Sequence, residues 1–246
     1  MKTVSLNELV YELLELRRAN TKTTDPLDER LVIDWIQSTR AMLLKQKFSQ
    51  PFSFVDDHYV QHLGEISMTR VLSSTSIGLS GDEEKYVYRT IIAIPKPIKT
   101  KDGCGLFTRI GPADMLSDGF QITTYKKAFV SGNGKFNRNT VFAFVLGDYV
   151  YLYSRSGYHF GIPTITISGV FQDPIAAARI ANPSWTYDDD YPINKELIDR
   201  LKSIIVSSKF PLVLTQMEDK TDDREDNVGG KVIGVSKGET QDNSGL

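Results

Sequence analysis

The stretch that decides the fold is residues 141–154, VFAFVLGDYVYLYS. Apolar and aromatic residues stand on both sides of a Leu-Gly-Asp turn at residues 146–148, and glycine supplies the positive φ that a tight turn requires. This spacing predicts a β-hairpin. Alternation along its second strand places Tyr149, Tyr151 and Tyr153 on one face and aliphatic side chains on the other.

The same kind of pattern extends through a long central region. From residue 49 to about residue 189, short apolar runs are separated by Gly, Pro, Asn and Asp, as in β-sandwiches and barrels. Residues 86–94 predict a strand closed by a Pro-Lys-Pro sequence, and residues 120–130 and 163–171 are further strand candidates. Helical periodicity is scarce here, so we expect a mostly antiparallel β domain at residues 49–189.

Helical patterns flank this β region. Ser5 and Glu8 have the spacing of a capping box, and an apolar stripe follows them. An Asp-Pro pair at residues 25–26 suits the N-cap and first turn of a second helix, which we expect to end near Lys47. A third stripe at residues 195–210 predicts a third helix.

These patterns predict an α+β fold. Residues 1–48 and 190–215 would form a helical bundle, with the β domain (a sandwich or barrel) inserted between its second and third helices. Residues 216–246 are charged or rich in Gly, Asn, Asp and Ser, and such a segment cannot offset its own ordering entropy. We expect residues 216–246 to be either disordered or an extended arm that orders only against a partner.

Composition excludes several classes of function. The 246 residues carry a net charge of −2, which gives no electrostatic reason to bind nucleic acid or an acidic membrane. The one cysteine, Cys104, forms no internal disulfide and no cysteine metal cluster within a chain. The N-terminus lacks the features of a signal peptide, and no apolar run approaches the roughly 20 residues of a membrane span. We therefore expect a soluble protein made in a cytoplasm.

Two histidines have the spacing of zinc ligands on a helix. His58 and His62 are four residues apart, with Asp56 and Asp57 nearby, so a metal-dependent hydrolase is one hypothesis. No HExxH sequence is formed, and ordinary polar positions on a strand explain the pair better.

Two glycine-rich loops also lack the features of a binding or catalytic site. Residues 132–135, GNGK, lack the spacing of a phosphate-binding loop, and a hairpin turn explains them better. Residues 102–105, DGCG, hold a thiol with no neighbouring histidine to activate it. We therefore predict no catalytic, cofactor-binding or metal-ligating residues and no cofactor.

Acidic clusters and the tyrosine face are the remaining candidates. The acidic clusters are Asp188, Asp189 and Asp190, and then Asp219, Asp222, Asp223 and Asp226. Solvated loops are the favoured interpretation, and the alternative is an interface with Arg17, Arg18 and Arg40 of another copy. The three tyrosines of the hairpin favour packing on another layer or subunit. Their alternative role is a stacking platform in a carbohydrate- or peptide-binding module.

Several stretches together resemble one protein family. They are NELVYELLELRRA (7–19), DPLDERLVIDWIQSTRAMLLKQKF (25–48), LGDYVYLYS (146–154), ISGVFQDP (167–174), YPINKELIDRLKSIIVSSKF (191–210) and DDREDN (222–227). The chain resembles the ring proteins, or head-to-tail adaptors and connectors, of crAss-like short-tailed phages.

The resemblance implies a non-enzymatic structural protein of the virion, located in the portal, neck or tail region and assembled in the bacterial cytoplasm. Its copies would form a closed ring, of twelve subunits by analogy, next to the portal protein or an adjacent tail ring. Genomic DNA would pass through the lumen without specific binding, and no membrane would be involved. A slightly acidic chain agrees with this, since a conduit should not grip phosphates.

Overall fold

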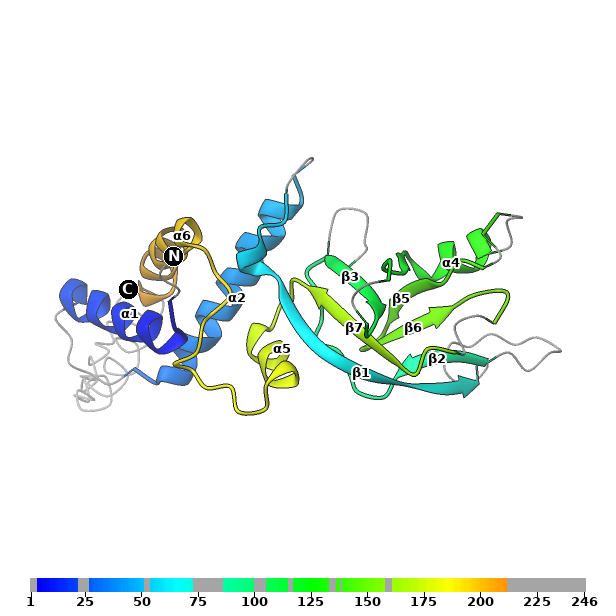
Figure 1. Ribbon diagram of the computed structural model, residues 1–246. Helices are drawn as coiled ribbons and strands as arrows, with labels where there is room; N and C mark the ends of the chain where they lie inside the picture. Colours follow the sequence, from blue (N-terminus) through cyan, green and yellow to red (C-terminus); the bar gives the residue numbers. More distant parts are fainter. Residues whose placement is uncertain are drawn as a thin grey trace, which may run out of the picture.

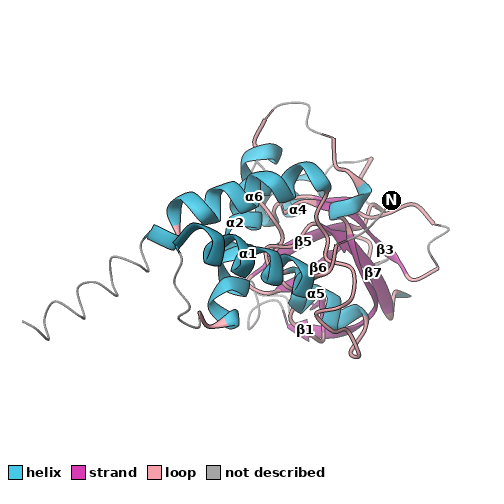
Figure 2. Cartoon of the chain, turned by 90° about the vertical axis from the view of Figure 1, so that its left-hand side faces the viewer, coloured by secondary structure: helices cyan, strands magenta, loops and turns pink. Residues whose placement is uncertain are grey.

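The molecule is elongated, with helices at one end and a β-sheet at the other (Figure 1). This computed structural model describes residues 4–21, 27–50, 54–72, 86–99, 105–114, 117–132, 136–137, 139–157 and 161–211. Viewed from the helical end, the helices stand in front of the strands (Figure 2).

Three helices form the bundle: α1 (Leu6–Thr21), α2 (Glu29–Phe48) and α6 (Lys195–Ser208). Their apolar stripes meet in one core, as the three-stripe pattern predicts. Its fully or almost fully buried residues include Leu9, Leu13, Ile36, Leu44, Leu201 and Ile205. The predicted association of two N-terminal helices with a distant C-terminal helix is confirmed.

Caps define where these helices begin. The backbone N–H of Glu8 donates to the Ser5 hydroxyl at 3.1 Å, as expected of a capping pair. The start predicted for α2 is wrong by three residues, because its N-cap is Asp28 and not Asp25. The Asp28 carboxylate accepts from the Arg30 N–H at 2.9 Å, which is the hydrogen bond expected of Asp25. Residues 25 and 26 lie outside the described residues.

Seven strands form one sheet in the order β3-β7-β1-β2-β6-β5-β4. Their bounds are β1 (Gln61–Leu72), β2 (Tyr86–Thr90), β3 (Phe107–Pro112), β4 (Gln121–Ile122), β5 (Phe142–Leu146), β6 (Tyr149–Tyr153) and β7 (Thr164–Gly169). All neighbours are antiparallel except β4 and β5. The Phe120 N–H donates to the Ile110 carbonyl at 2.6 Å, which joins the two ends of the sheet into a nearly closed barrel.

The predicted hairpin is confirmed as β5 and β6. Leu146 pairs with Tyr149 across the turn, and Gly147 has φ 62°. The aliphatic face points into the barrel, where Val150 and Leu152 are buried. The aromatic face lies under α4 (Tyr125–Gly132), so both faces of the hairpin are covered.

Two helices within the predicted β region differ from expectation. The strand candidate at residues 120–130 is wrong after Ile122, because the chain turns into α4 and packs Tyr125, Ala128 and Phe129 against Phe144. α5 (Pro174–Ala181) begins at Asp173, which caps the Ile175 and Ala176 N–H groups at 3.0 Å each. The strand candidates at residues 86–94 and 163–171 are confirmed as β2 and β7, and β2 ends early, at Thr90.

The bundle core continues into the barrel side of the molecule. Tyr59, Ile98, Val170 and Ile175 belong to the same buried cluster as the three helices. A second cluster fills the barrel and a third lies between α4 and the hairpin. The division at residues 48–49 and 189–190 stays a prediction, and the predicted arm at residues 216–246 lies outside the described residues.

Candidate assembly surface

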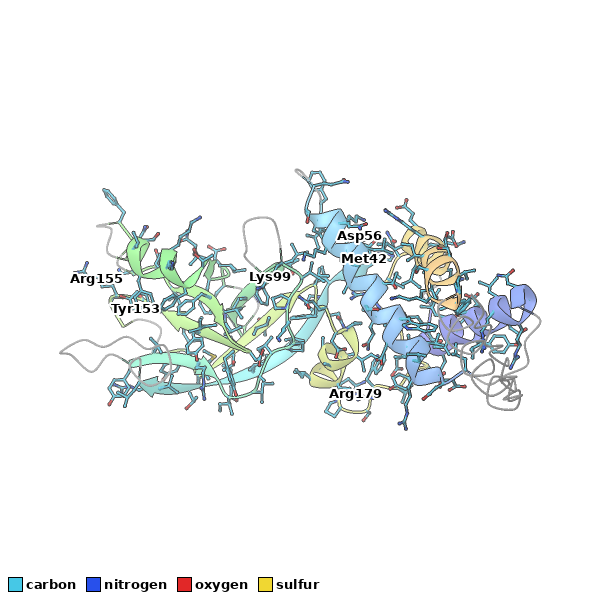
Figure 3. All side chains as sticks on the ribbon, turned by 180° about the vertical axis from the view of Figure 1, so that it is seen from behind. Met42, Asp56, Lys99, Tyr153, Arg155 and Arg179 are labelled. Atoms are coloured by element: carbon cyan, nitrogen blue, oxygen red, sulfur yellow. The ribbon has the colours of Figure 1, made fainter. Side chains whose placement is uncertain are left out.

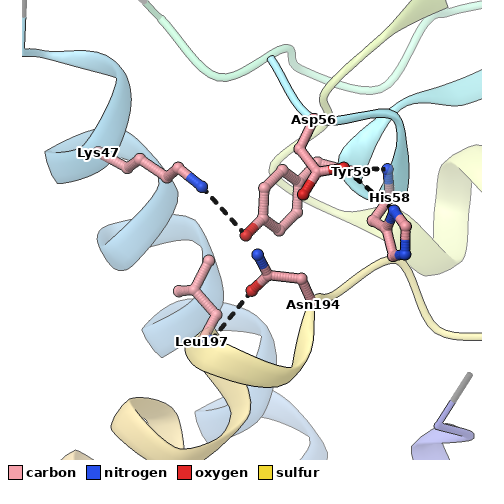
Figure 4. A network of polar contacts seen from close by, with 6 residues as sticks. All are labelled: Lys47, Asp56, His58, Tyr59, Asn194 and Leu197. Atoms are coloured by element: carbon pink, nitrogen blue, oxygen red, sulfur yellow. Dashed lines mark hydrogen bonds and ion pairs between the residues drawn. The ribbon is translucent and has the colours of Figure 1, made fainter. Parts of the chain in front are cut away.

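A polar network joins the end of α2, the start of α6 and the short 3-10 helix η1 (Asp57–Tyr59) (Figure 4). Tyr59 is fully buried, and the Lys47 ammonium donates to its hydroxyl at 3.3 Å and lies 4.7 Å from its ring centroid. Burial, and secondly the charge of Asp56, raises the pKa of Tyr59 to about 12, so the phenol stays neutral. Asn194 caps α6 beside it, accepting from the Leu197 N–H at 3.0 Å.

The two histidines of the metal hypothesis make separate contacts. The His58 imidazole lies 3.0 Å from the Asp56 carboxylate, and the hydrogen bond from the His58 backbone N–H lowers the pKa of Asp56. His62 is instead on β1, and its Nδ1 lies 2.7 Å from the Ser168 hydroxyl of β7. Within the part of the chain that the structure describes, no three His, Cys, Asp or Glu side chains form a group that could hold a metal ion. Cys104 and residues 133–135 lie outside it.

Arg40 is an internal anchor between the helices and the barrel. It is fully buried on α2, and its guanidinium donates to the Pro192 carbonyl at 2.9 Å and the Phe171 carbonyl at 3.0 Å. Burial lowers the pKa of Arg40, and burial raises the pKa of the adjoining Tyr191 to about 12. Arg17 is buried as well. The hypothesis that Arg17 and Arg40 receive acidic residues of another copy is therefore wrong. Arg18 is exposed and pairs with Glu15 at 2.6 Å, and for Arg18 the hypothesis stays a prediction.

The first acidic cluster, residues 188–190, contacts the start of α1. The Asn7 amide donates to Asp188 at 2.6 Å, and Asp190 pairs with Ser5 in an isolated antiparallel bridge. Asp189 accepts from the Thr186 N–H at 2.7 Å. These contacts make the cluster part of the loop that leads into α6, while the second cluster, residues 219–226, lies outside the described residues.

The tyrosine face is used within the chain. Tyr151 is 3% exposed and stacks on Phe144 with centroids 5.6 Å apart and planes 7° apart. The Phe129 ring of α4 lies 4.4 Å from that of Tyr153. Packing on another layer is thus confirmed, and Tyr151 offers no surface to a sugar or peptide.

A concave surface lies where α2 meets the barrel. It consists of two adjoining cavities of about 320 and 540 Å³ that share Lys99 and Gln172, and we call it the lysine groove. Figure 3 shows Met42 on α2 and Lys99 on the barrel side of this junction. The smaller cavity is lined by Ala41, Met42, Lys45, Ile98, Lys99 and Gln172. The larger one reaches the barrel mouth past Lys96, Phe107, Ile110, Ile122 and Leu146.

The lysine groove has an apolar floor and a cationic rim. Ile98 and Ile110 are buried, whereas Lys45, Lys96 and Lys99 are exposed. No Asp or Glu is among its described lining residues. Backbone hydrogen bonds from Ile98 to Val170 at 2.8 Å and from Gln172 to Lys96 at 2.9 Å hold the lysine-bearing segment on the barrel.

Sequence reasoning missed this groove. The Pro-Lys-Pro sequence at residues 95–97 indicates only the end of a strand, and the helical spacing of Met42 with Ile36 and Leu43 predicts only a place in an apolar stripe of the second helix. In the structure Met42 is 42% exposed. The three lysines come from two segments about 50 residues apart, so no local pattern indicates the site.

Comparison with protein families decides the identity of the chain. Residues 8–228 match the model of the family described as phage tail ring protein 2. The chain belongs to this family. The match confirms the resemblance to crAss-like phage ring proteins, and it covers both the bundle and the barrel. No curated protein matches the chain.

Membership in the tail ring family places the protein among the structural components of phage tails. A ring protein functions through contacts with further subunits, so its exposed surfaces, rather than an enclosed pocket, are where function is expected. Across the described residues of this ring protein, no helix is both long enough and apolar enough to span a bilayer.

Proposed function

We propose that the protein is a non-enzymatic subunit of a closed ring in the head-to-tail connector of the virion. The observation that carries this proposal is the family match over residues 8–228. Twelve copies would form the ring, next to the portal protein or an adjacent tail ring, after assembly in the host cytoplasm.

Exposed apolar side chains on separate elements support assembly through two different faces. Tyr11 lies exposed on α1, in the bundle, and Phe54 is 90% exposed before η1. Val130 on α4 and Phe136 just after it, which is 94% exposed, lie on the barrel side. A ring built from one protein needs two such faces that differ, because its contacts are heterologous and close by rotation.

The proposed lumen would serve as a conduit for the genome without holding it. The chain carries a net charge of −2, so its overall field does not attract phosphates. A conduit that bound DNA tightly would slow its passage, which favours a surface of this kind.

Electron microscopy of the purified full chain and of virions tests the proposal. We expect closed rings of uniform size from the purified protein, and the same protein in the connector of the virion when it is labelled with antibody. A protein that stays monomeric at micromolar concentration and is absent from virions would contradict the proposal. We also expect no retention of duplex DNA on the rings at physiological salt.

A further inference from the structure

The lysine groove has the chemistry to bind an extended peptide that carries apolar and acidic residues side by side. Its partly exposed apolar side chains, which are Phe107, Ile122 and Leu146 on the barrel and Met42 on α2, would accept the apolar residues. Its rim of Lys45, Lys96 and Lys99 would attract carboxylates.

The chain itself contains such a peptide directly after the last described residue, Pro211. Residues 212–226 read LVLTQMEDKTDDRED, in which Leu212, Val213, Leu214 and Met217 precede an acidic stretch. Six of the nine residues at 218–226 are Asp or Glu. The family match continues past Pro211 to residue 228, so it includes this segment.

The direction of α6 favours the groove of another copy. Asn194, at the start of α6, lies by Tyr59 and the C-terminal end of α2 (Figure 4). At the other end, the Phe210 ring lies 6.1 Å from that of Trp35, so α6 runs antiparallel to α2. Met42 and Lys45 lie between these two points on α2. The last described residues of α6 therefore lie toward the Trp35 end of α2, and no residue of α6 is among the described lining residues of the groove.

We propose that residues 212–226 of one subunit bind in the lysine groove of the adjacent subunit. The apolar residues would cover Met42 and the floor, and the acidic residues would pair with Lys45, Lys96 and Lys99. This inference rests on the ring proposed above, and it identifies one of its heterologous contacts. Leu212 follows Pro211 directly, so the groove of the adjacent subunit must begin close to the end of α6.

Cysteine cross-linking between two kinds of full-length subunit tests the contact. Both carry Cys104→Ser, which removes the one native thiol; one adds Lys99→Cys with an affinity tag, and the other adds Asp222→Cys. A disulfide requires Cβ atoms about 4 Å apart, so it reports close approach. We expect a disulfide-linked pair in the mixture under mild oxidation, and little in either preparation alone.

Charge reversal provides the second test. Lys45→Glu with Lys99→Glu should weaken ring association by about fivefold or more, and so should Asp222→Lys with Asp223→Lys. The two changes combined in one chain should restore association. The matched control is Arg30→Glu with Arg179→Glu, two exposed cations on α2 and α5 outside the lysine groove, which should have no effect.

The outcomes separate this proposal from the ring itself. Normal rings without the mixed cross-link, and without any effect of the charge reversals, would overturn the docking proposal and leave the ring intact. A third variant with Cys104→Ser, Lys99→Cys and Asp222→Cys in one chain would also overturn it if it formed only the disulfide within that chain. Lysine reversals that change DNA retention but not association would assign the groove to nucleic acid instead. Failure of the unmodified chain to form rings would contradict the proposed function.

Discussion

Arg40 lies where α2 meets the segment that leads into α5, and it donates to two carbonyl oxygens, a buried one at Phe171 and a partly buried one at Pro192. Replacement by alanine leaves the Phe171 and Pro192 carbonyls without their donor, so we expect Arg40→Ala to lower the free energy of unfolding by roughly 2 to 5 kcal/mol. Arg40→Lys should recover only part of this, because a single ammonium cannot reproduce the guanidinium fork. Urea unfolding measures both.

Arg30→Ala is the matched control, since Arg30 is exposed on the same helix. We expect a change within about 0.5 kcal/mol for this variant. An equally small effect of Arg40→Ala would show that Arg40 does not anchor the bundle to the barrel.

Asp56 links stability to pH. Its pKa is lowered in the folded chain, first by the His58 backbone N–H, so the ionised form stabilises the fold. That contribution is present above the unfolded pKa of about 3.9 and is lost as the pH falls through the lowered folded value. We expect Asp56→Asn to reduce the dependence of the melting temperature on pH between about pH 2 and 5.

Thermal melting across this range, with Asp199→Asn on the exposed side of α6 as the control, provides the measurement. If the melting temperature of Asp56→Asn fell with decreasing pH as steeply as that of the unmodified chain, Asp56 would not be the cause of that fall.

The hairpin of β5 and β6 depends on one backbone conformation. Gly147 has φ 62°, and nothing lies within 4 Å of the position where a Cβ would stand, so strain alone would oppose a side chain there. We expect Gly147→Ala to cost about 1 kcal/mol and Gly147→Asn less, because asparagine tolerates this conformation.

Gly161→Ala is the control, because that glycine is equally open but is without a positive φ. Chemical unfolding of the three variants would contradict this account if Gly147→Ala and Gly161→Ala cost the same.

The bundle and the hairpin could be predicted because their signals are local. Leu9 and Leu13 recur at helical spacing, and Gly147 stands between two apolar runs. α4 could not be predicted, because aromatic residues such as Tyr125 and Phe129 are equally common in strands. Their helical position depends on packing against Phe144, which is distant in the sequence. Strand order could not be predicted either, because Gln61 of β1 pairs with Gly169 of β7, more than a hundred residues away.

At the scale of the whole molecule, the C-terminal segment separates folding from assembly. Truncation after Leu214 removes the acidic residues but none of the described elements, so we expect the chain to melt at the same temperature. Ring association should weaken, because the charged half of the proposed contact is lost. Circular dichroism and sedimentation velocity measure the two effects.

Truncation after Val228 is the control, since it retains all of the sequence that matches the family. We expect it to assemble as the full chain does. Equal association of both truncated chains would contradict an assembly role for residues 215–228.

The assembly site was harder to predict than the fold for a physical reason. The lysine groove joins α2 to residues 96–99 and to Gln172, three segments that only tertiary folding brings together. The acidic segment, in contrast, is evident from composition alone. The sequence therefore indicates the acidic segment of the proposed contact, but not the lysine groove that would bind it.

The insertion of the barrel between α2 and α6 also sets an order of events during synthesis. About 150 residues separate the end of α2 from the start of α6, so a ribosome adding roughly 5 to 20 residues per second completes α6 on the order of 10 to 30 s after α2. Throughout that interval Ile36 and Leu44 lack the side chains of α6 that later cover them. The nascent chain thus exposes an uncovered apolar stripe while its barrel is already being made, which is when chaperones would bind it.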